Sequence, residues 1–365
     1  MNGFYDYRLG DVCSRLSSGK SISSKDIFPK GSVPVYGGNG LRGYTGKANF
    51  TGECAIVGRQ GAFCGNVRFF SGKAYMTEHA VVVCANEHHN TRYLAYLLST
   101  MNLGLLSGQS AQPGLSVKTL GQQIVSLPSK SMQNKVVAVL SSIEDKIEAN
   151  EKINHNLQQQ AQMLYKDFFP YSVDVALPDG WRVGTVGEII EIHDSKRIPL
   201  SGAEREKMEK KLYPYYGAAS LMDFVDDYIF DGKYLLLGED GTVVDDAGYP
   251  ILQYVWGRFW VNNHAHILTG KLGYNVESLY MLFKQTPVNS IVTGAVQPKI
   301  SQANLRSIQV VIPPEKLLTE YNNRVEPLFA LLRTNEEENK SLSALRDTLL
   351  PKLMSGEIDV TAVKL

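Results

Sequence analysis

The sequence predicts an α+β protein: two pseudo-repeated α/β globules joined by two long helices that pair as an antiparallel coiled coil. Three observations support this fold class. Short motifs recur about 185 positions apart, the apolar spacing changes twice to that of a long helix, and the chain has 365 residues. Because ordinary domains contain roughly 100 to 200 residues, a chain of this length fits two of them.

The repeat joins motifs from the two halves of the chain. Residues 111–116 (AQPGLS) match 296–301 (VQPKIS) at a shift of 185, and residues 34–37 (PVYG) match 214–217 (PYYG) at a shift of 180. Solenoid repeats contain roughly 20 to 50 residues, so a period of this length indicates a duplicated domain. Two similar modules on one chain suit a ligand that has two separated halves.

Both globules show short apolar runs that are separated by glycines, a pattern typical of strands and loops. The first globule is expected to span residues 1–130 and the second 171–316. In the first we expect strands at 55–57, 67–70 and 80–84 and short helices at 92–99 and 117–123; in the second, strands at 234–237, 254–256 and 266–268 and a helix at 277–284.

The segments 131–170 and 317–365 carry an apolar stripe whose spacing alternates between four and three, the pattern of a coiled coil. So long a stripe requires an apolar partner, and the nearest one is the second copy of the same helix. The alternative is that each helix packs on its own globule. The stripe positions are Val136, Leu140, Ile143, Ile147, Asn150, Asn154, Leu157, Ala161, Leu164 and Phe168, and 185 residues later Tyr321, Val325, Leu328, Leu332, Asn335, Asn339, Leu342, Arg346, Leu349 and Leu353.

Two asparagines interrupt each stripe at equivalent layers: Asn150 and Asn154 in the first helix, Asn335 and Asn339 in the second. Buried asparagines weaken a coiled coil but fix its register, since a slip would place amides against leucine. If the helices run antiparallel, Asn150 is expected to face Asn339 and Asn154 to face Asn335.

The whole chain contains 37 basic and 37 acidic residues, but the two globules differ. Residues 1–130 hold 13 Lys and Arg against 6 Asp and Glu, whereas residues 171–316 hold 14 against 18. The first globule can therefore meet phosphate directly, while the second needs a local basic patch or a partner protein. No segment approaches the roughly 18 uncharged apolar residues of a membrane helix, and residues 1–8 lack a signal core, so we expect a cytoplasmic protein without membrane contact.

We find no common catalytic motif in this sequence. Residues 38–43 match GxGxxG, but the following tract (YTGK) cannot begin a helix, so a glycine-rich loop is the better interpretation. The acidic pairs 226–227 and 245–246 are interpreted as solvated loops, and the four cysteines as buried thiols in preference to a zinc site. We therefore predict no catalytic residue, no cofactor and no metal.

The loops of both globules are rich in side chains that hydrogen-bond base edges and phosphates. Arg suits guanine, and Asn or Gln suits adenine, in the major groove. The motifs around the loops persist between the copies while the loop residues diverge, as expected if two equivalent scaffolds recognise two different sequences. For each residue the alternative is a solvated loop side chain. The candidates for DNA binding are Tyr36, Asn39, Arg42, Tyr44, Arg59, Gln60, Arg68, Lys73 and Gln112 in the first globule, and Tyr215, Tyr216, Lys233, Arg258, Asn262, Asn263, Gln297 and Lys299 in the second.

Over nearly its whole length the chain resembles the specificity subunit of type I restriction-modification systems. The resemblance rests on the tandem order of globule and helix, the tract 34–40, the loop from Gln112 to Pro128 with its second copy at 297–313, and the terminal element 349–356. It implies that each globule is a target recognition domain and that the helices are the conserved regions. It also implies that catalysis belongs to partners: two modification subunits that methylate adenine with S-adenosylmethionine, and restriction subunits that use ATP.

On this basis we expect a non-catalytic subunit that binds double-stranded DNA at a bipartite, asymmetric site. Each globule would read one half of the site, and the coiled coil would set the spacing and dock the methyltransferase subunits. One alternative is a duplicated protein-interaction scaffold with a coiled-coil spacer. Another is an enzyme whose site is not recognisable from its motifs.

Overall fold

The computed structural model describes residues 3–107, 114–294 and 296–363. The chain divides into two compact units, each of which combines one globule with half of each long helix. The first unit contains residues 1–149 and 338–365, and the second contains residues 150–337. This division cuts across the four consecutive segments that we expected, because each helix contributes to both units.

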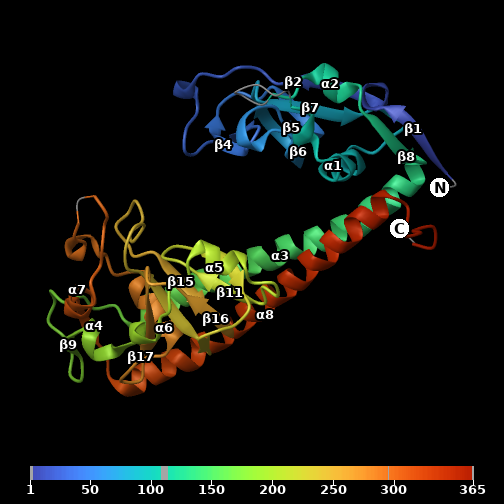
Figure 1. The fold of residues 1–365 in the computed structure, drawn as a ribbon. Helices are drawn as coiled ribbons and strands as arrows, with labels where there is room; N and C mark the ends of the chain where they lie inside the picture. The colour runs from blue at the N-terminus through green and yellow to red at the C-terminus, as the bar shows by residue number, and fades with distance from the viewer. Residues whose placement is uncertain (1–2, 108–113, 295, 364–365) are drawn as a thin grey trace. The chain divides into compact units, whose positions relative to one another are not determined.

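The first globule is built on a six-stranded sheet in the order β2-β7-β5-β6-β3-β4, with α1 packed against β5, β6 and β7 (Figure 1). A separate two-stranded sheet pairs β1 with β8. The expected strands lie inside β5, β6 and β7, and the expected helices correspond to α1 and α2, which confirms these predictions. The elements are β1 (Phe4–Arg8), β2 (Cys13–Ser18), β3 (Val33–Gly37), β4 (Gly40–Thr45), β5 (Phe50–Gly58), β6 (Val67–Met76), β7 (Ala80–Ala85), α1 (Thr91–Ser99), α2 (Val117–Gly121) and β8 (Ile124–Pro128).

Strand β5 pairs antiparallel with β6 on one side and with β7 on the other. Beyond the end of β5, the N–H of Arg59 donates to the carbonyl of His79 at 3.0 Å, which continues the pairing of β5 with β7. Gly52 and Gly72 face each other in the hairpin of β5 and β6 with φ angles of +119° and +131°, values that favour glycine. The loops that follow β3, β5 and β6 meet at one edge of the globule.

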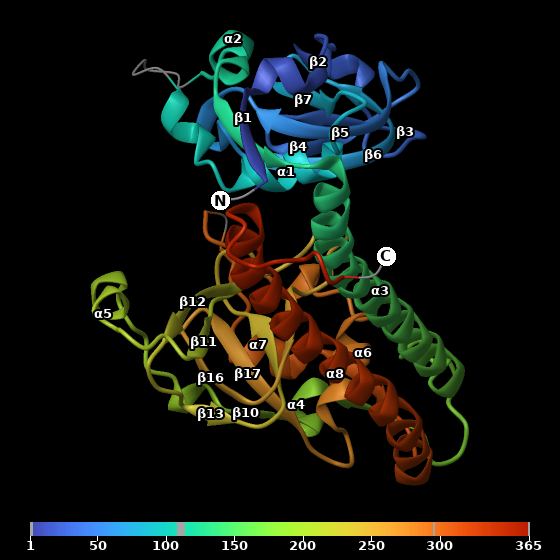
Figure 2. The same ribbon diagram turned by 90° about the vertical axis from the view of Figure 1, so that its right-hand side faces the viewer.

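The second globule contains two four-stranded sheets, β10-β17-β14-β15 and β12-β11-β16-β13, and a two-stranded sheet of β9 and β18. Figure 2 shows α5 at the outer side of these strands, where its Arg205 pairs with Asp223 of β12 at 2.8 Å. The expected strands are present, although β15 lies slightly earlier than predicted. The elements are β9 (Arg182–Thr185), α4 (Val186–Ile189), β10 (Ile190–Ile192), α5 (Gly202–Glu206), β11 (Tyr213–Tyr216), β12 (Leu221–Val225), β13 (Phe230–Asp231), β14 (Tyr234–Gly238), β15 (Leu252–Val255), β16 (Arg258–Val261), β17 (Ala265–Gly270), α6 (Val276–Phe283), α7 (Gln302–Ser307) and β18 (Gln309–Ile312).

The two globules share one strand topology. The order β2-β7-β5-β6 corresponds to β10-β17-β14-β15, and the parallel pairing of β3 with β6 corresponds to that of β11 with β16. Even the helix caps repeat, since Asn90 before α1 and Asn275 before α6 each accept a hydrogen bond from an N–H of the first turn. The repeat in the sequence is therefore a repeat of the fold.

The central strands of both globules are buried on both faces. In β7, Val81 and Val83 join the apolar cluster of α1, whereas Val82 joins a separate cluster with residues of β5 and β6. In β14, Leu235 and Leu236 divide between two clusters in the same way. Because alternate side chains of a strand point to opposite faces, these strands are apolar at almost every position.

The two long helices, α3 (Lys130–Phe168) and α8 (Glu315–Met354), run antiparallel. In the second unit the Tyr321 hydroxyl donates to the carbonyl of Ala161 at 3.3 Å, and in the first unit Lys146 pairs with Glu338 at 3.2 Å. Residue numbers thus fall along α8 as they rise along α3. All stripe positions of both helices are buried or half-buried, which confirms the predicted pattern.

The asparagine layers are inside the helix pair. Asn335 donates its amide N–H to Oδ1 of Asn154 at 2.8 Å, and Asn154 donates to the carbonyl of Leu332 at 3.3 Å. The predicted pairing of Asn154 with Asn335 is therefore confirmed. Asn150 is 1% exposed, and Asn339 donates to the carbonyl of Ile147 at 3.4 Å; the pairing of Asn150 with Asn339 stays a prediction.

Both expected modes of helix packing occur. Val136 and Leu140 of α3, with Leu353 of α8, belong to the core of the first globule. Tyr321 and Phe329 of α8 belong to the core of the second. The helices therefore pair with each other and also cover the globules. Among the described residues, no helix combines the length and the apolar character needed to cross a membrane.

Candidate nucleic-acid interface

An open cavity of about 530 Å³ lies at the loop edge of the first globule. It is lined by the turn between β3 and β4 and by the loops after β5 and β6, and three of the predicted DNA-binding residues, Asn39, Arg42 and Gln60, meet there with His79. The Gln60 Oε1 lies 2.9 Å from Nδ1 of His79. The cavity therefore offers amide, guanidinium and imidazole groups on one concave surface.

Two more predicted arginines lie next to this cavity. The guanidinium of Arg68 approaches Gly40 so closely that a Cβ there would lie 3.2 Å from Arg68 Cζ. Arg59 immediately precedes Gln60, and its guanidinium lies 3.4 Å from Oγ of Ser18. Together with Arg42, these side chains give the edge a positive charge suited to phosphate or guanine.

The remaining candidates of the first globule lie elsewhere. Tyr36 is half-buried and packs on Phe70 with ring centroids 5.0 Å apart. Tyr44 is half-buried in β4, and Lys73 is exposed in β6 opposite Thr51. Gln112 lies outside the described residues.

The second globule places different side chains at the same loop positions. The N–H of Glu239 donates to the carbonyl of His264 at 2.8 Å, as that of Arg59 does to His79 at 3.0 Å. The carbonyl of Glu239 accepts from Ile300, just as that of Arg59 accepts from Leu115, both at 2.8 Å. Glu239 is therefore the structural counterpart of Arg59, with the opposite charge.

Two of the predicted DNA-binding residues of the second globule are buried in its fold. Tyr215 is 2% exposed, and its hydroxyl lies 3.1 Å from the backbone nitrogen of Leu200. Asn262 is 4% exposed, and its Oδ1 accepts from the N–H of His264 at 2.8 Å. Both side chains hold backbone segments, so we leave them out of the proposed DNA surface.

The charge of Lys233 is compensated inside the second unit. Its Nζ lies 2.8 Å from Glu277 and 2.8 Å from Glu326. Tyr216 is half-buried beside Phe259, and burial raises the pKa of its phenol. These two candidates are also parts of the fold, and polar character in the sequence did not distinguish them from surface groups.

Four candidates of the second globule remain accessible: Arg258, Asn263, Gln297 and Lys299. Arg258 pairs with Asp231 at 3.1 Å. The ammonium of Lys299 lies 3.2 Å from Oε1 of Glu239. Asn263, Gln297 and Lys299 lie on the loops that surround Glu239, at the edge equivalent to the cavity of the first globule.

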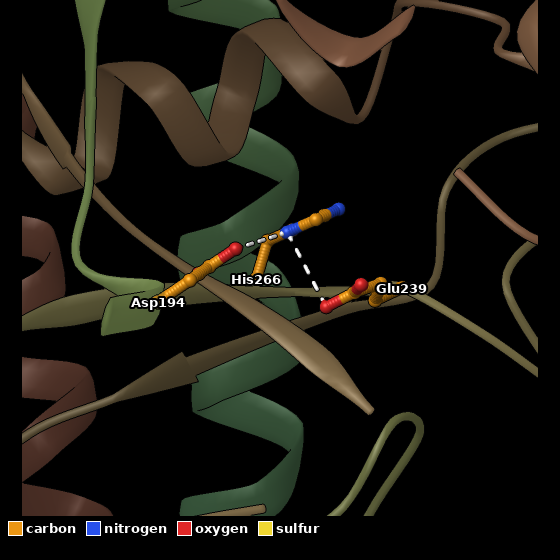
Figure 3. Close-up of side chains that lie close together, drawn as sticks. All are labelled: Asp194, Glu239 and His266. Carbon is orange, nitrogen blue, oxygen red and sulfur yellow. Dashed lines mark hydrogen bonds and ion pairs between the residues drawn. The ribbon is translucent and has the colours of Figure 1, made fainter. Parts of the chain in front are cut away.

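A group of charged side chains lies next to this second edge, and Figure 3 shows three of them, Asp194, Glu239 and His266. Nδ1 of His266 lies 2.6 Å from Asp194 and 3.7 Å from Glu239. Arg197 pairs with both carboxylates, at 3.4 Å and 2.6 Å, and Gln302 donates to Asp194 at 2.6 Å. The group connects the segment before α5, the loop after β14, strand β17 and the start of α7.

Asp194, Glu239 and His266 have the spacing of metal ligands. The hydrogen bonds of His266 nevertheless indicate a structural role for this group. Nε2 of His266 lies 2.8 Å from the carbonyl of Ile300, which can only accept, so this nitrogen carries a proton. Nδ1 faces a carboxylate that also accepts from the N–H of Ile267 at 2.9 Å. Both ring nitrogens of His266 therefore already have partners within the protein, and neither faces an open position for a metal.

The carboxylates in this group are held in their charged forms. Burial alone would raise the pKa of Asp194, but the hydrogen bond from His266, its charge and the N–H of Ile267 bring the pKa below its ordinary value of 3.8. Burial would likewise raise the pKa of Glu239, but the hydrogen bond from Arg197 and the charges of His266 and Arg197 bring this pKa below its ordinary value. The edge of the second globule is thus a preorganised network of fixed charges.

Reasoning from the sequence missed several residues that the fold brings to the two edges: His79 and His264, and the pair of Asp194 with Arg197. The repeat contained a usable signal, since a shift of 180 aligns residues 59 and 60 with 239 and 240 and a shift of 185 aligns His79 with His264. No pattern along the chain indicated that Asp194 and His266 meet, because they are 72 residues apart.

The fold and these edges define a tandem recognition protein, in which one scaffold appears twice and carries different polar groups at equivalent positions. The chain belongs to the family of type I restriction modification DNA specificity domains, whose model matches residues 1–159 and 178–345.

Named relatives agree with this family. The chain is 27% identical over 308 residues to the type I restriction enzyme MjaIX specificity subunit of Methanocaldococcus jannaschii, a match that covers 74% of this chain and 69% of that protein. It is 37% identical over 140 residues to the type I restriction enzyme EcoprrI specificity subunit of Escherichia coli, covering 37% of this chain and 35% of that protein. The match thus spans about a third of the E. coli relative's length.

The fold is also similar to a solved structure. The crystal structure of a type I restriction-modification system S subunit from M. genitalium superposes with a TM-score of 0.64 at 19% identity, covering 96% of both chains. At this level of identity the likeness concerns the fold, which is the predicted arrangement of two mixed α/β globules and two long helices.

Proposed function

We propose that this chain is the sequence-specific DNA-recognition subunit of a type I restriction-modification complex. Each globule reads one half of a bipartite, asymmetric site in double-stranded DNA. The helix pair of α3 and α8 sets the distance between the half-sites and docks two modification subunits, which restriction subunits then join. The chain supplies recognition, and its partners supply the chemistry.

The observation that carries this proposal is the exchange of polar groups on a repeated scaffold. Arg59 and Glu239 have the same backbone partners and opposite charges. A protein that bound one ligand twice would keep these groups alike. Different groups on equivalent edges are expected for a protein that binds two different base sequences, because the pattern of donors and acceptors in the major groove identifies each base pair.

The experiment is a selection from a library of randomised duplexes with the full chain, followed by sequencing of the bound DNA. We expect two short blocks of fixed bases that differ in sequence and are separated by unread pairs. Asn39→Ala and Arg59→Ala should each weaken binding to the first block by about 1 to 3 kcal/mol if these side chains contact bases. Lys207→Ala, which removes one positive charge from the second globule, is the control and should leave the first block unchanged.

Two results would count against the proposal. A wild-type chain that enriches no sequence would remove DNA recognition as its function. Enrichment of a single continuous block would leave recognition in place but contradict the division into half-sites.

The alternative is a scaffold whose two globules bind proteins. It has the same fold, so binding must distinguish the two functions. Phosphate contacts release counterions, so binding to a specific duplex should weaken steeply as salt rises, whereas protein contacts mostly lack this dependence. Protein–DNA affinities usually drop strongly as salt rises from about 50 to about 200 mM. An affinity that hardly changes over this range would favour the protein-binding scaffold.

A further inference from the structure

Position 60 in the first globule and position 240 in the second occupy the same place in the repeated fold. Each follows the residue whose N–H donates to the carbonyl of the equivalent histidine, His79 or His264. Each also forms an isolated backbone bridge with the loop that precedes the next short helix, Gln60 with Gly114 and Asp240 with Lys299. The backbone therefore presents these two side chains in the same way.

The equivalent histidine holds each of these side chains. Nδ1 of His79 lies 2.9 Å from Oε1 of Gln60, and Nδ1 of His264 contacts Oδ1 of Asp240. In both pairs an imidazole N–H donates to an oxygen, so this oxygen is turned toward the histidine and the other end of the amide or carboxylate is turned away from it. The groups that remain for a ligand differ between the globules.

Gln60 is left with its amide NH₂, which can only donate. It is exposed and lines the cavity with Asn39 and Arg42. At the centre of the major-groove edge, guanine and thymine carry carbonyl acceptors, O6 and O4, whereas adenine and cytosine carry amino donors, N6 and N4. A fixed donor at this position fits guanine or thymine.

Asp240 is left with a second carboxylate oxygen, which can only accept. Its side chain is 17% exposed and is held at the loop edge. The adjacent Gly241 donates its N–H to the carbonyl of Pro298 at 3.0 Å, which fixes this loop against the segment that carries Gln297 and Lys299. A fixed acceptor at this position fits the amino group of adenine or cytosine.

We propose that Gln60 and Asp240 are equivalent specificity-determining residues, each reading one base in its own half-site. Gln60 selects a base with a carbonyl acceptor, and Asp240 selects a base with an amino donor. His79 and His264 are positioning residues that orient the two side chains. This inference rests on the proposed DNA-recognition function and adds to it the chemical class of base that each half accepts.

Two isosteric variants exchange the chemistry of the two positions. Gln60→Glu converts the free donor into an acceptor, and Asp240→Asn leaves a free amide donor once the amide oxygen accepts from His264. In the selection from randomised duplexes, Gln60→Glu should change one position of the first block from guanine or thymine to adenine or cytosine. Asp240→Asn should make the reverse change at one position of the second block. The preference at that position should change by about fivefold to a hundredfold.

Asp246→Asn is the matched control, because it removes one negative charge from the same exposed segment between β14 and β15. It should leave both blocks unchanged. The two exchanges are independent of each other, so the inference remains testable through Gln60→Glu if Asp240→Asn reduces folding.

The outcomes separate this inference from the function on which it rests. If the wild-type chain enriches two blocks and neither variant changes a base, the function stands and the inference is overturned. Changes in the opposite half, or at several positions at once, also overturn it. If the wild-type chain enriches no sequence, the proposed function itself fails.

Discussion

At the scale of single residues, the decisive feature of the second globule is that its charged side chains are buried together. Asp194 accepts from His266, from the N–H of Ile267 and from Gln302, and it also lies near Arg197. A buried charge is costly unless it is paired and hydrogen-bonded, and each member of this group meets that condition. The group holds the loop of Glu239 and the start of α7 in one arrangement.

Removal of one partner should therefore destabilise the second unit. Asp194→Asn removes the carboxylate that pairs with Arg197 and His266, and the loss of one member of a buried ion pair costs about 3 to 5 kcal/mol. All three tryptophans of the chain, Trp181, Trp256 and Trp260, belong to this unit, so their fluorescence in urea follows its unfolding. Asp246→Asn is the control, and an equal effect of both variants would show that the buried group is not responsible.

Asp194 also determines in which direction the stability of the second unit changes with pH. The pKa of Asp194 is lower in the folded chain than its ordinary value of 3.8, so its stabilising contribution is fully present above that value. The contribution is lost as the pH falls through the lower folded-state pKa. We expect the free energy of unfolding of the second unit to fall below about pH 4 in the wild type and to fall less in Asp194→Asn. Tryptophan fluorescence in urea series between neutral and acid pH would measure both curves, and parallel curves would contradict this assignment.

At the scale of elements, the contacts between globule and long helix are repeated with reversed charge. Arg92 of α1 pairs with Glu144 of α3 at 2.7 Å. The equivalent residue of α6, Glu277, pairs with Arg333 of α8 at 3.2 Å. A globule docked on the wrong half of the helix pair would place like charges together, so the reversal favours correct docking in a chain that contains the same fold twice.

The asparagine layer makes a second prediction at this scale. Asn154→Leu removes the acceptor of the Asn335 amide and leaves a buried polar group, which costs about 1 to 3 kcal/mol. Leucine at both positions replaces the polar layer by an apolar one and should recover this loss, at the expense of register. Tryptophan fluorescence in urea measures the stability of both variants, since both residues belong to the second unit. A double variant less stable than the single one would contradict this account of the layer.

At the scale of the whole molecule, the proposal gives the helix pair the role of a ruler. Each residue adds about 1.5 Å to a helix, so two heptads add roughly 21 Å, or about six base pairs. Two heptads inserted after Asn150 and two matching heptads before Asn339 should lengthen the unread gap by about six pairs and leave both base blocks unchanged. The selection from randomised duplexes measures this gap directly. A variant that still enriches both blocks with the original gap would show that the helices do not set the spacing.

The sequence by itself determined the fold class, the duplication and the two long helices. These features follow from local and periodic patterns: alternating apolar spacing, glycines between strands, and asparagines at matching layers of each stripe. The a/d stripe identified the buried face of both helices, and the pairing of Asn154 with Asn335 followed from an antiparallel arrangement of the copies.

Only the tertiary structure decided which polar side chains are available. Tyr215, Lys233 and Asn262 have the composition of a recognition loop, yet each has partners inside the fold. Conversely, the contact of Asp194 with His266 joins residues 72 positions apart. Periodicity records which face of an element is apolar, whereas the burial and pairing of a polar group depend on contacts distant in the sequence, and these form only when the chain folds.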